Sequence, residues 1–202
     1  MADIAVYSGS FNPLHIGHLA IIRHLIEEAD FDMVYLIVSP KNPLKDSISS
    51  LSARDRYNAA VDAVNRHFTP LSEVADNPTA TAFPSTKVLV DDIELNMPEP
   101  HYSIRTLRAL RGREPGNTFT LIMGADNLAC IRNWKDYQNI LTDFGVAVFP
   151  REGHDILSIR QELLTESPSY KIRLLDAPLV TISSTEIREA IQHGKDISQY
   201  LM

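Results

Sequence analysis

The stretch IAVYSGSFNPLHIGHLA, residues 4–20, decides how this chain begins to fold. Its first four residues, 4–7, form a short apolar run typical of a buried β-strand. After a polar turn, Leu19, Ile22 and Ile26 recur at the spacing of one face of an α-helix. A strand that passes through a short turn into a helix is the first half of a βαβ unit, the repeating element of parallel sheets.

The same alternation continues along the whole sequence. It predicts right-handed crossovers in a mainly parallel, doubly wound sheet with helices on both faces, which is a Rossmann-like α/β fold. Because no repeat or linker interrupts the pattern, we expect residues 1–202 to form one domain. Residues 76–86 are expected to form a surface loop. The predicted strands cover residues 4–7, 33–39, 86–94, 118–124, 145–150 and 171–176, and the later helices cover 52–68, 101–112, 133–141, 155–164 and 183–194.

The composition narrows the range of functions. The 19 basic and 26 acidic residues give a net charge of −7, which argues against non-specific binding to nucleic acid or to an anionic membrane. An anionic substrate would therefore need a local binding pocket. The lone Cys130 excludes an internal disulfide and a thiolate metal cluster. Since no signal-peptide pattern or membrane-length apolar run is found, we expect a cytoplasmic protein.

The turn between the first strand and the first helix carries residues suited to phosphate binding. In parallel α/β sheets, ligands bind beyond the carboxyl ends of the strands, where a loop leads into a helix N-terminus. Gly9 permits close approach to the backbone, and the amides around Ser10 and Phe11 can hold an oxyanion. His15 and His18 can project from one face of the first helical turn and hydrogen-bond phosphate oxygens. From spacing alone, two surface histidines or a metal site without an evident third ligand are the alternatives.

A second helix start, near the other end of the sequence, has a similar character. Ser183 and Glu186 have the S-x-x-E spacing of a capping box before an apolar-periodic helix, and by themselves they indicate only a capped helix. Ser184 and Thr185 add hydroxyl groups at a helix end that favours anions, and Arg188 adds a permanently charged fork of donors. We therefore expect the first and the last strand each to deliver a phosphate-binding helix end.

Two segments resemble the motifs of the nucleotidyltransferase superfamily. They are GSFNPLHIGH (9–18), similar to S/T-F-x-P-x-H-x-G-H, and ISSTEIR (182–188), similar to I-S-S-T-x-I/V-R. Between them, HYSIRTLRAL (101–110) and IMGADNLACIRNWKDYQNIL (122–141) are similar to segments of the bacterial nicotinate mononucleotide adenylyltransferases, and the likeness covers nearly the whole chain. The resemblance implies that ATP, with bound Mg²⁺, reacts with nicotinate mononucleotide to give deamido-NAD and pyrophosphate.

The resemblance also assigns roles to residues. It implies that Gly9, Ser10 and Phe11 hold the α-phosphate of ATP, and that Ser184 and Arg188 hold the β- and γ-phosphates. His18 would stabilise the charge that grows in the transition state, with His15 and Arg188 beside it. The further residues implied are Asp126, Ser183 and Thr185 for ATP, and Lys45, Ser103, Trp134, Lys135 and Arg151 for the mononucleotide.

Several of these positions also have an ordinary structural interpretation. Asp126 could equally be the N-cap of a helix. Trp134 could be a core residue, and Lys45 could be a solvated surface residue. Arg54 and Arg56, in the helix predicted over 52–68, are expected on its solvated face.

The sequence departs from the family pattern at four places. Ser8 replaces the first glycine of the usual Gly-Gly pair, and Asn12 stands where aspartate is common. Leu44 occupies the histidine position of the family's P-P-H-K loop, so one phosphate contact is missing or supplied elsewhere. Ser103 replaces a usual threonine but keeps its hydroxyl group.

Other functions remain as alternatives to the adenylyl transfer. The nearest is another member of the superfamily, a phosphopantetheine adenylyltransferase or a cytidylyltransferase, although the GADN and NW segments favour the pyridine enzyme. A non-catalytic nucleotide-binding module is the alternative from a different class. A dinucleotide dehydrogenase is disfavoured because no G-x-G-x-x-G follows the first strand. The sequence leaves open whether the chain forms a homo-oligomer.

Overall fold

One parallel sheet organises the computed structural model, which describes residues 1–40, 52–68, 87–180 and 182–202. Its strands follow the order β3-β2-β1-β4-β5-β6, and every pairing between neighbours is parallel. The order reverses direction between β1 and β4, so the loops after these two strands diverge and leave room for a ligand. The strands are β1 (Asp3–Gly9), β2 (Met33–Val38), β3 (Val88–Asp91), β4 (Thr118–Gly124), β5 (Val146–Phe149) and β6 (Ile172–Leu174).

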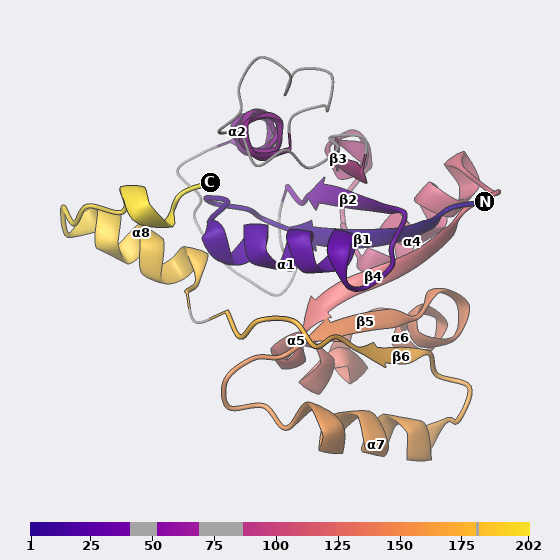
Figure 1. The fold of residues 1–202 in the computed structure, drawn as a ribbon. Helices are drawn as coiled ribbons and strands as arrows, with labels where there is room; N and C mark the ends of the chain where they lie inside the picture. Colours follow the sequence, from indigo (N-terminus) through magenta and orange to yellow (C-terminus); the bar gives the residue numbers. More distant parts are fainter. Residues whose placement is uncertain (41–51, 69–86, 181) are drawn as a thin grey trace.

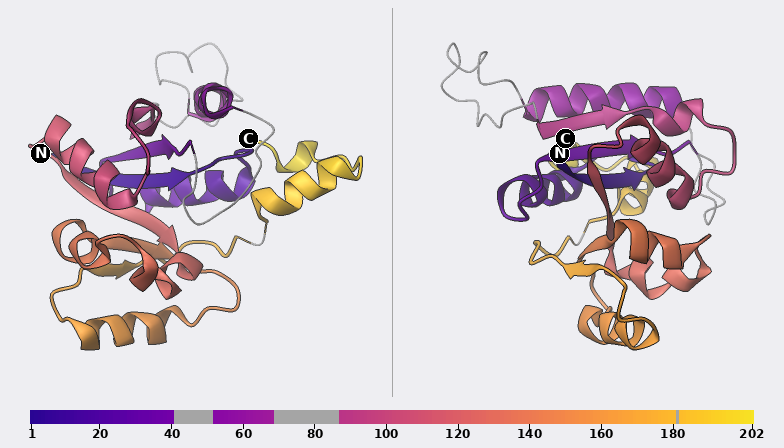
Figure 2. Two further views of the ribbon diagram at one scale, coloured as in Figure 1. Left: turned by 180° about the vertical axis from the view of Figure 1, so that it is seen from behind. Right: turned by 90° about the vertical axis from the view of Figure 1, so that its right-hand side faces the viewer.

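Helices cover both faces of this sheet, as the alternation predicts. Figures 1 and 2 show α1 and α4 on opposite faces, while α8 stands at the carboxyl edge of β1. The helices are α1 (Ile16–Glu27), α2 (Ala53–His67), α4 (Ser103–Arg113), α5 (Ala125–Ala129), α6 (Tyr137–Asn139), α7 (Ile156–Glu166) and α8 (Ser184–Gln192). Shorter 3₁₀ turns cover Ile93–Asn96, Ile131–Asn133 and Ser198–Tyr200, and a π-helical turn covers Ile140–Phe144.

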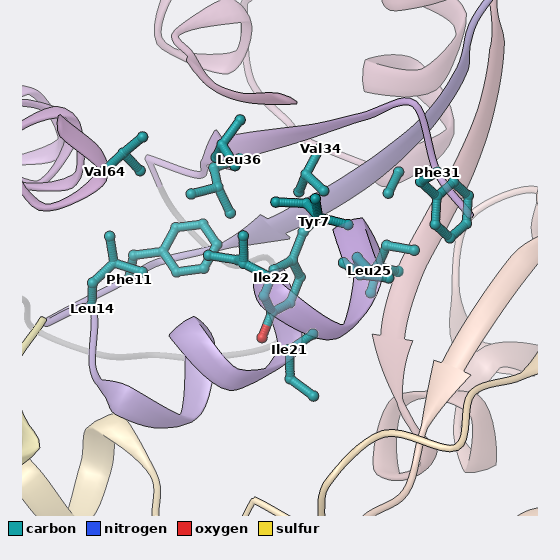
Figure 3. Packing of buried hydrophobic residues seen from close by; sticks show 14 of the residues in the cluster. Tyr7, Phe11, Leu14, Ile21, Ile22, Leu25, Phe31, Val34, Leu36 and Val64 are labelled. Atoms are coloured by element: carbon teal, nitrogen blue, oxygen red, sulfur yellow. The ribbon is translucent and has the colours of Figure 1, made fainter. Parts of the chain in front are cut away.

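The two faces of β1 bury its side chains in two separate cores. Ala5 and Tyr7 join the cluster under α1 and α2, whereas Ile4 and Val6 join the cluster under α4 and α7. Figure 3 shows Tyr7 packed beside Ile22 in the first cluster. A strand that is buried on both faces reads as a continuous apolar run, which is why residues 4–7 carry no polar alternation.

The structure corrects three of the predicted elements. The strand predicted over 86–94 ends at Asp91, because the Asp91 carboxylate accepts a hydrogen bond from the Ile93 N–H at 2.9 Å and turns the chain. The helix predicted over 133–141 is broken into short turns, with Asp136 in the left-handed region at φ 51°. The last strand does not lead directly into α8, because residues 175–180, which have no regular secondary structure, follow it. The loop predicted over 76–86 lies outside the described residues, and the single domain stays a prediction.

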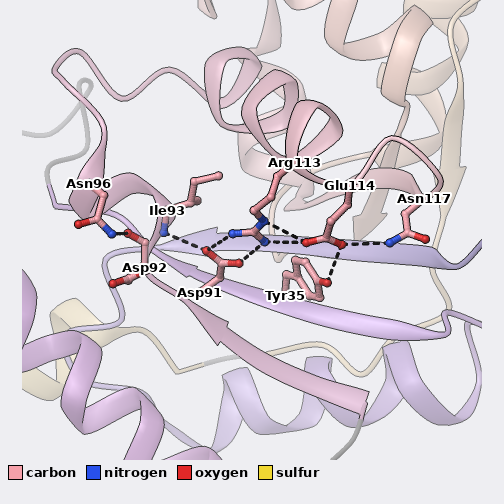
Figure 4. Close-up of polar contacts among 8 residues, drawn as sticks. All are labelled: Tyr35, Asp91, Asp92, Ile93, Asn96, Arg113, Glu114 and Asn117. Carbon is pink, nitrogen blue, oxygen red and sulfur yellow. Dashed lines mark hydrogen bonds and ion pairs between the residues drawn. The ribbon is translucent and has the colours of Figure 1, made fainter.

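A polar network ties the C-terminal end of α4 to the edge of the sheet. Arg113 forms an ion pair with Asp91, whose side chain is only 5% exposed, and a second with Glu114 at 2.9 Å. Tyr35 on β2 donates a hydrogen bond to Glu114 at 2.9 Å (Figure 4). Burial and the Glu114 hydrogen bond raise the pKa of Tyr35 to about 12. The network fixes α4, whose other end reaches the candidate site described below.

Removing the arginine of this network should destabilise the fold. Arg113→Met leaves the Asp91 carboxylate buried without its cation, so we expect the free energy of unfolding to fall by about 1–3 kcal/mol. Arg54→Met is the matched control, because Arg54 and Asp92 form an exposed ion pair at 3.3 Å that should contribute less than about 0.5 kcal/mol. Urea unfolding of both variants measures the difference, and equal losses would contradict this assignment.

Candidate active site

The loop between β1 and α1, residues 10–15, is held by hydrogen bonds to its backbone. The Ser39 N–H at the end of β2 donates to the Gly9 carbonyl at 2.9 Å. Phe11 adopts a positive φ of 44° and buries its ring in the core. This unusual backbone conformation costs free energy for a residue with a side chain, so the surrounding contacts must enforce it.

Arg56 supplies one of those contacts, and the prediction that it lies on a solvated helix face is wrong. Its side chain is 2% exposed, and its guanidinium donates to the carbonyls of Ser10, Ser39 and Pro40. Arg54 is exposed, as expected. Helical spacing could have identified the burial of Arg56, because it lies four residues before Ala60 on the inner face of α2.

The two histidines of the first motif lie side by side at the start of α1. His15 is the N-cap residue, and its N–H donates to Nδ1 of His18 at 3.2 Å. Their ring centroids are 3.7 Å apart. Because Nδ1 of His18 accepts a hydrogen bond, its proton resides on Nε2 in the neutral ring. A Cβ at Gly17 would overlap Val180 and come within 3.0 Å of the His15 ring, which explains the glycine between the histidines.

Both imidazoles are neutral near pH 7. Burial, with a smaller effect of Arg151, lowers the pKa of His15 to about 4. Burial and the neighbouring His15 lower the pKa of His18 well below its usual value. The pair therefore acts as hydrogen-bond donors and acceptors in the free protein, and an anion bound beside it would favour protonation.

The second motif meets the first at the N-terminus of α8. Ser183 caps the helix and exchanges hydrogen bonds with Glu186, which confirms the predicted capping box. Ser184 donates to the carbonyl of Pro13 at 3.2 Å. Arg188 donates to the carbonyl of Asn12 at 2.9 Å, and also to the hydroxyl of Thr185 at 2.9 Å. Residues about 170 positions apart in the sequence are thus joined at one edge of the sheet.

Asp126 follows β4 and Arg151 follows β5, so both residues lie at the same carboxyl edge of the sheet as the histidines. The Arg151 guanidinium is 3.8 Å from the Asp126 carboxylate and donates to the Val180 carbonyl at 3.2 Å. The N-cap of α5 is Gly124, so the alternative that Asp126 is the N-cap is wrong. Both charged groups reach the carboxyl edge of the sheet, where they can influence a ligand that contacts His15.

A cavity adjoins the β1–α1 loop on the α4 side of the sheet. The predicted residues Ser103, Trp134 and Lys135 all line it, together with Gly9 and Ser10. Trp134 is half-buried rather than part of the closed core. Arg151 is not among the lining residues, and Lys45 and Leu44 lie outside the described part of the chain. The cavity also contains polar groups that the sequence analysis did not select: Ser8, Ser39, Glu94 and His101.

The start of α4 faces this cavity with its positive pole. Ser103 is the first residue of the helix, and no described side chain caps this end. The helix has no acidic residue in its first turn. Free amides and the hydroxyl group of Ser103 make this wall of the cavity suitable for a carboxylate or another anion.

Within the described ranges, no three histidine, cysteine, aspartate or glutamate side chains gather as a metal site requires. This arrangement suits a magnesium ion that arrives on the phosphates of a nucleotide and keeps several waters.

The same described residues contain no helix with the length and apolar character needed to cross a membrane.

The fold and the site together define a nucleotidyltransferase-like α/β protein, with two helix N-termini at one carboxyl edge and a cavity beside them. The chain belongs to the cytidylyltransferase-like family, whose profile matches residues 6–190, and within it to the nicotinate-nucleotide adenylyltransferases. A "Probable nicotinate-nucleotide adenylyltransferase" of Flavobacterium johnsoniae is 35% identical over 198 residues, covering 98% of this chain and 91% of that protein. One of Cytophaga hutchinsonii is 35% identical over 199 residues, covering 98% and 90%.

A solved structure supports the same fold at lower sequence identity. The nicotinic acid mononucleotide adenylyltransferase of Plasmodium falciparum, complexed with NaAD, superposes with a TM-score of 0.76. It is 18% identical, and the match covers 100% of this chain and 91% of that one. The Rossmann-like architecture predicted from the sequence is therefore confirmed.

The low pKa of the histidine pair can be measured directly. In NMR titrations of the free protein, we expect the His15 ring to titrate near pH 4 and the pKa of His18 to lie well below its usual value. Since the unfolded histidines take up protons at a pKa of about 6.5, the free energy of unfolding should fall as pH decreases from 6.5 toward 4. Titration of both rings near their unfolded value would show that the pair is not desolvated.

Proposed function

We propose that this chain transfers the adenylyl group of ATP to nicotinate mononucleotide, giving deamido-NAD and pyrophosphate. The observation that carries the proposal is the junction of the two motifs: Arg188 and Ser184 of α8 bond the backbone of the β1–α1 loop next to His18. The names of the relatives agree with this reaction. The cavity beside the junction supplies room for the second substrate.

The reaction needs positioning and charge stabilisation more than proton transfer. A phosphate oxygen of the mononucleotide, already ionised at neutral pH, attacks the α-phosphorus of ATP. The bond from that phosphorus to the bridging oxygen breaks, and pyrophosphate leaves with the electron pair. Magnesium, when bound to the triphosphate, would neutralise part of its charge. No general base is required, so catalysis depends on aligning two polyanions and stabilising the growing charge.

The residues of the two motifs suit this task. His18 presents its Nε2–H from the first turn of α1, where developing charge on the α-phosphate is also stabilised by the helix N-terminus. His15 lies beside it with Nδ1 buried and without a partner in the described structure. The backbone at Gly9, Ser10 and Phe11 completes the α-phosphate subsite that we propose.

The leaving pyrophosphate is assigned to the start of α8. Ser183, Ser184 and Thr185 bring hydroxyl groups and amides to this helix end, and Arg188 retains further N–H groups beyond its two contacts within the protein. Asp126 is placed near ATP, where it can orient the nucleotide or its hydrated magnesium. These assignments are those that the family resemblance implies, and the positions and donor groups of the residues support them.

The mononucleotide is assigned to the cavity at α4. The face of Trp134 can stack on an electron-poor pyridine ring, and the ring carboxylate can accept hydrogen bonds from Ser103 and the backbone at Lys135. Arg151, outside this lining, can reach the mononucleotide phosphate as it approaches the histidines. We leave Lys45 as a prediction from the sequence.

An assay with ATP and a panel of acceptor phosphates tests the proposal. We expect deamido-NAD and pyrophosphate in equal amounts, with kcat/KM for nicotinate mononucleotide about ten- to a hundredfold above that for the amide. The reason is that a carboxylate accepts hydrogen bonds from both the Ser103 hydroxyl and the backbone N–H at Lys135, whereas a carboxamide turns its NH₂ group toward one of these donors. Ser103→Ala should narrow this preference. Turnover of phosphopantetheine or a CTP-dependent reaction instead would contradict the proposal.

Replacing His18 tests the proposed α-phosphate subsite. His18→Ala should lower kcat by about two to three orders of magnitude, since the loss of one positioned donor to developing charge typically costs that much. His193→Ala is the control, because His193 is exposed at the far end of α8. Turnover of the His18 variant close to that of the parent, at saturating substrates, would remove His18 from the mechanism.

A further inference from the structure

The cavity at α4 contains a buried carboxylate that the mechanism above does not use. Glu94 lies in the 3₁₀ turn after β3, lines the cavity and is only 1% exposed. None of the ion pairs within the described residues includes it. Its oxygens instead accept hydrogen bonds from Ser39 at 2.6 Å and from Thr106 at 2.7 Å. A buried carboxylate without a cation is uncommon, because desolvation of the charge is costly.

The surrounding hydroxyl groups support the ionised form of Glu94. The single proton of the Ser39 hydroxyl points to Glu94, so Ser8, whose hydroxyl oxygen lies 3.0 Å from that of Ser39, must donate to Ser39. Thr106 donates to the other carboxylate oxygen. Two hydroxyl protons are thus donated to one carboxylate, and the hydroxyl of Ser8 supports Ser39 in this role. They stabilise its negative charge but do not neutralise it.

Among the described residues that line the cavity, no cationic side chain forms an ion pair with Glu94. Lys135 lies at the rim, with its side chain 60% exposed and its ammonium 3.5 Å from Asp136. His101 is bonded to the Met97 carbonyl at 3.1 Å. One part of the cavity lining therefore carries the carboxylate of Glu94, and another part carries the hydrogen-bond donors at the start of α4.

These two features are about one helical turn apart. Ser103 and Thr106 are three residues apart on α4, so their side chains lie on one face, with Cβ atoms roughly 5–6 Å apart. Ser103 begins the helix, and Thr106 holds Glu94. A ligand that joins an anionic substituent to a cationic ring matches this arrangement. Trp134, which lines the same cavity, offers an aromatic face that favours a cation as well.

We propose that Glu94 is the counter-charge for the pyridinium ring of the mononucleotide and selects for a cationic ring. The inference rests on the proposed function, because the ring nitrogen of nicotinate mononucleotide is quaternary and carries a positive charge. The ring carboxylate then lies toward Ser103, and the charged ring lies beside Glu94. Glu94 is a specificity-determining residue that acts through charge, and Ser39, Ser8 and Thr106 position it.

A reduced substrate separates charge from shape. The 1,4-dihydropyridine form of nicotinate mononucleotide keeps the ribose, phosphate and carboxylate but has a neutral ring. With wild-type protein and ATP, we expect kcat/KM to be at least about tenfold higher for the oxidised form. Glu94→Gln should lower kcat/KM for the oxidised form by about tenfold or more, and should change kcat/KM for the reduced form by less than about threefold. Thr106→Val is the matched control: it removes one hydrogen bond, keeps the charge and should retain the preference.

The outcomes distinguish this inference from the proposed function. Wild-type protein that forms no dinucleotide from either form would overturn both. If the wild-type protein is active and Glu94→Gln lowers kcat/KM equally for both substrates, the inference alone is overturned, because that result indicates a structural role for Glu94. If Glu94→Gln does not fold, as judged by thermal unfolding, the test is the ratio of kcat/KM for the oxidised form to kcat/KM for the reduced form, measured with the wild-type protein and with Thr106→Val. Ratios near one overturn the role of Glu94, and ratios of tenfold or more in both proteins support it.

Discussion

Two arginine side chains hold the backbone of the loop on which the site depends. Arg56 reaches from α2 to the carbonyl of Ser10, and Arg188 reaches from α8 to the carbonyl of Asn12. Because these carbonyls are bound to guanidinium groups, the loop keeps a conformation that places Phe11 at positive φ and directs the chain into α1. The two arginines lie 46 and 176 positions after the carbonyls that they bind. The phosphate site that we propose is thereby preorganised, so the loop does not need to rearrange when a ligand binds.

The local electrostatics of the site differ from those of the whole chain. The net charge of −7 disfavours anions at long range, and the two histidines are neutral in the free protein. Recognition of phosphate is therefore assigned to short-range donors: helix N-termini, hydroxyl groups, imidazole N–H groups and the Arg188 fork. Because hydrogen bonds act within a few ångströms and distant charges are screened by salt, such donors can outweigh the overall charge. At the cavity the charges are arranged for a zwitterion, with the start of α4 opposed by Glu94.

The sequence predicted the features that depend on local pattern. The histidine pair at the start of α1 and the capping box at Ser183 follow from neighbouring residues, and both lie as expected. Helical spacing places Arg56 on the inner face of α2, but only the tertiary fold brings its carbonyl partners at Ser10 and Ser39 together. Glu94 was missed because only the tertiary fold brings Ser39 and Thr106 to it. The broken helix after Trp134 has the same cause: tertiary packing overrides a helical pattern in short turns.

A crystal structure with a non-hydrolysable ATP analogue would show whether the junction of the two motifs binds the triphosphate. With α,β-methylene ATP, we expect the α-phosphate to lie against the β1–α1 loop within hydrogen-bond distance of Nε2 of His18. The β- and γ-phosphates should lie at the N-terminus of α8, beside Ser184 and Arg188. A triphosphate bound in the Trp134 cavity, or one that leaves the start of α8 without contact, would contradict it.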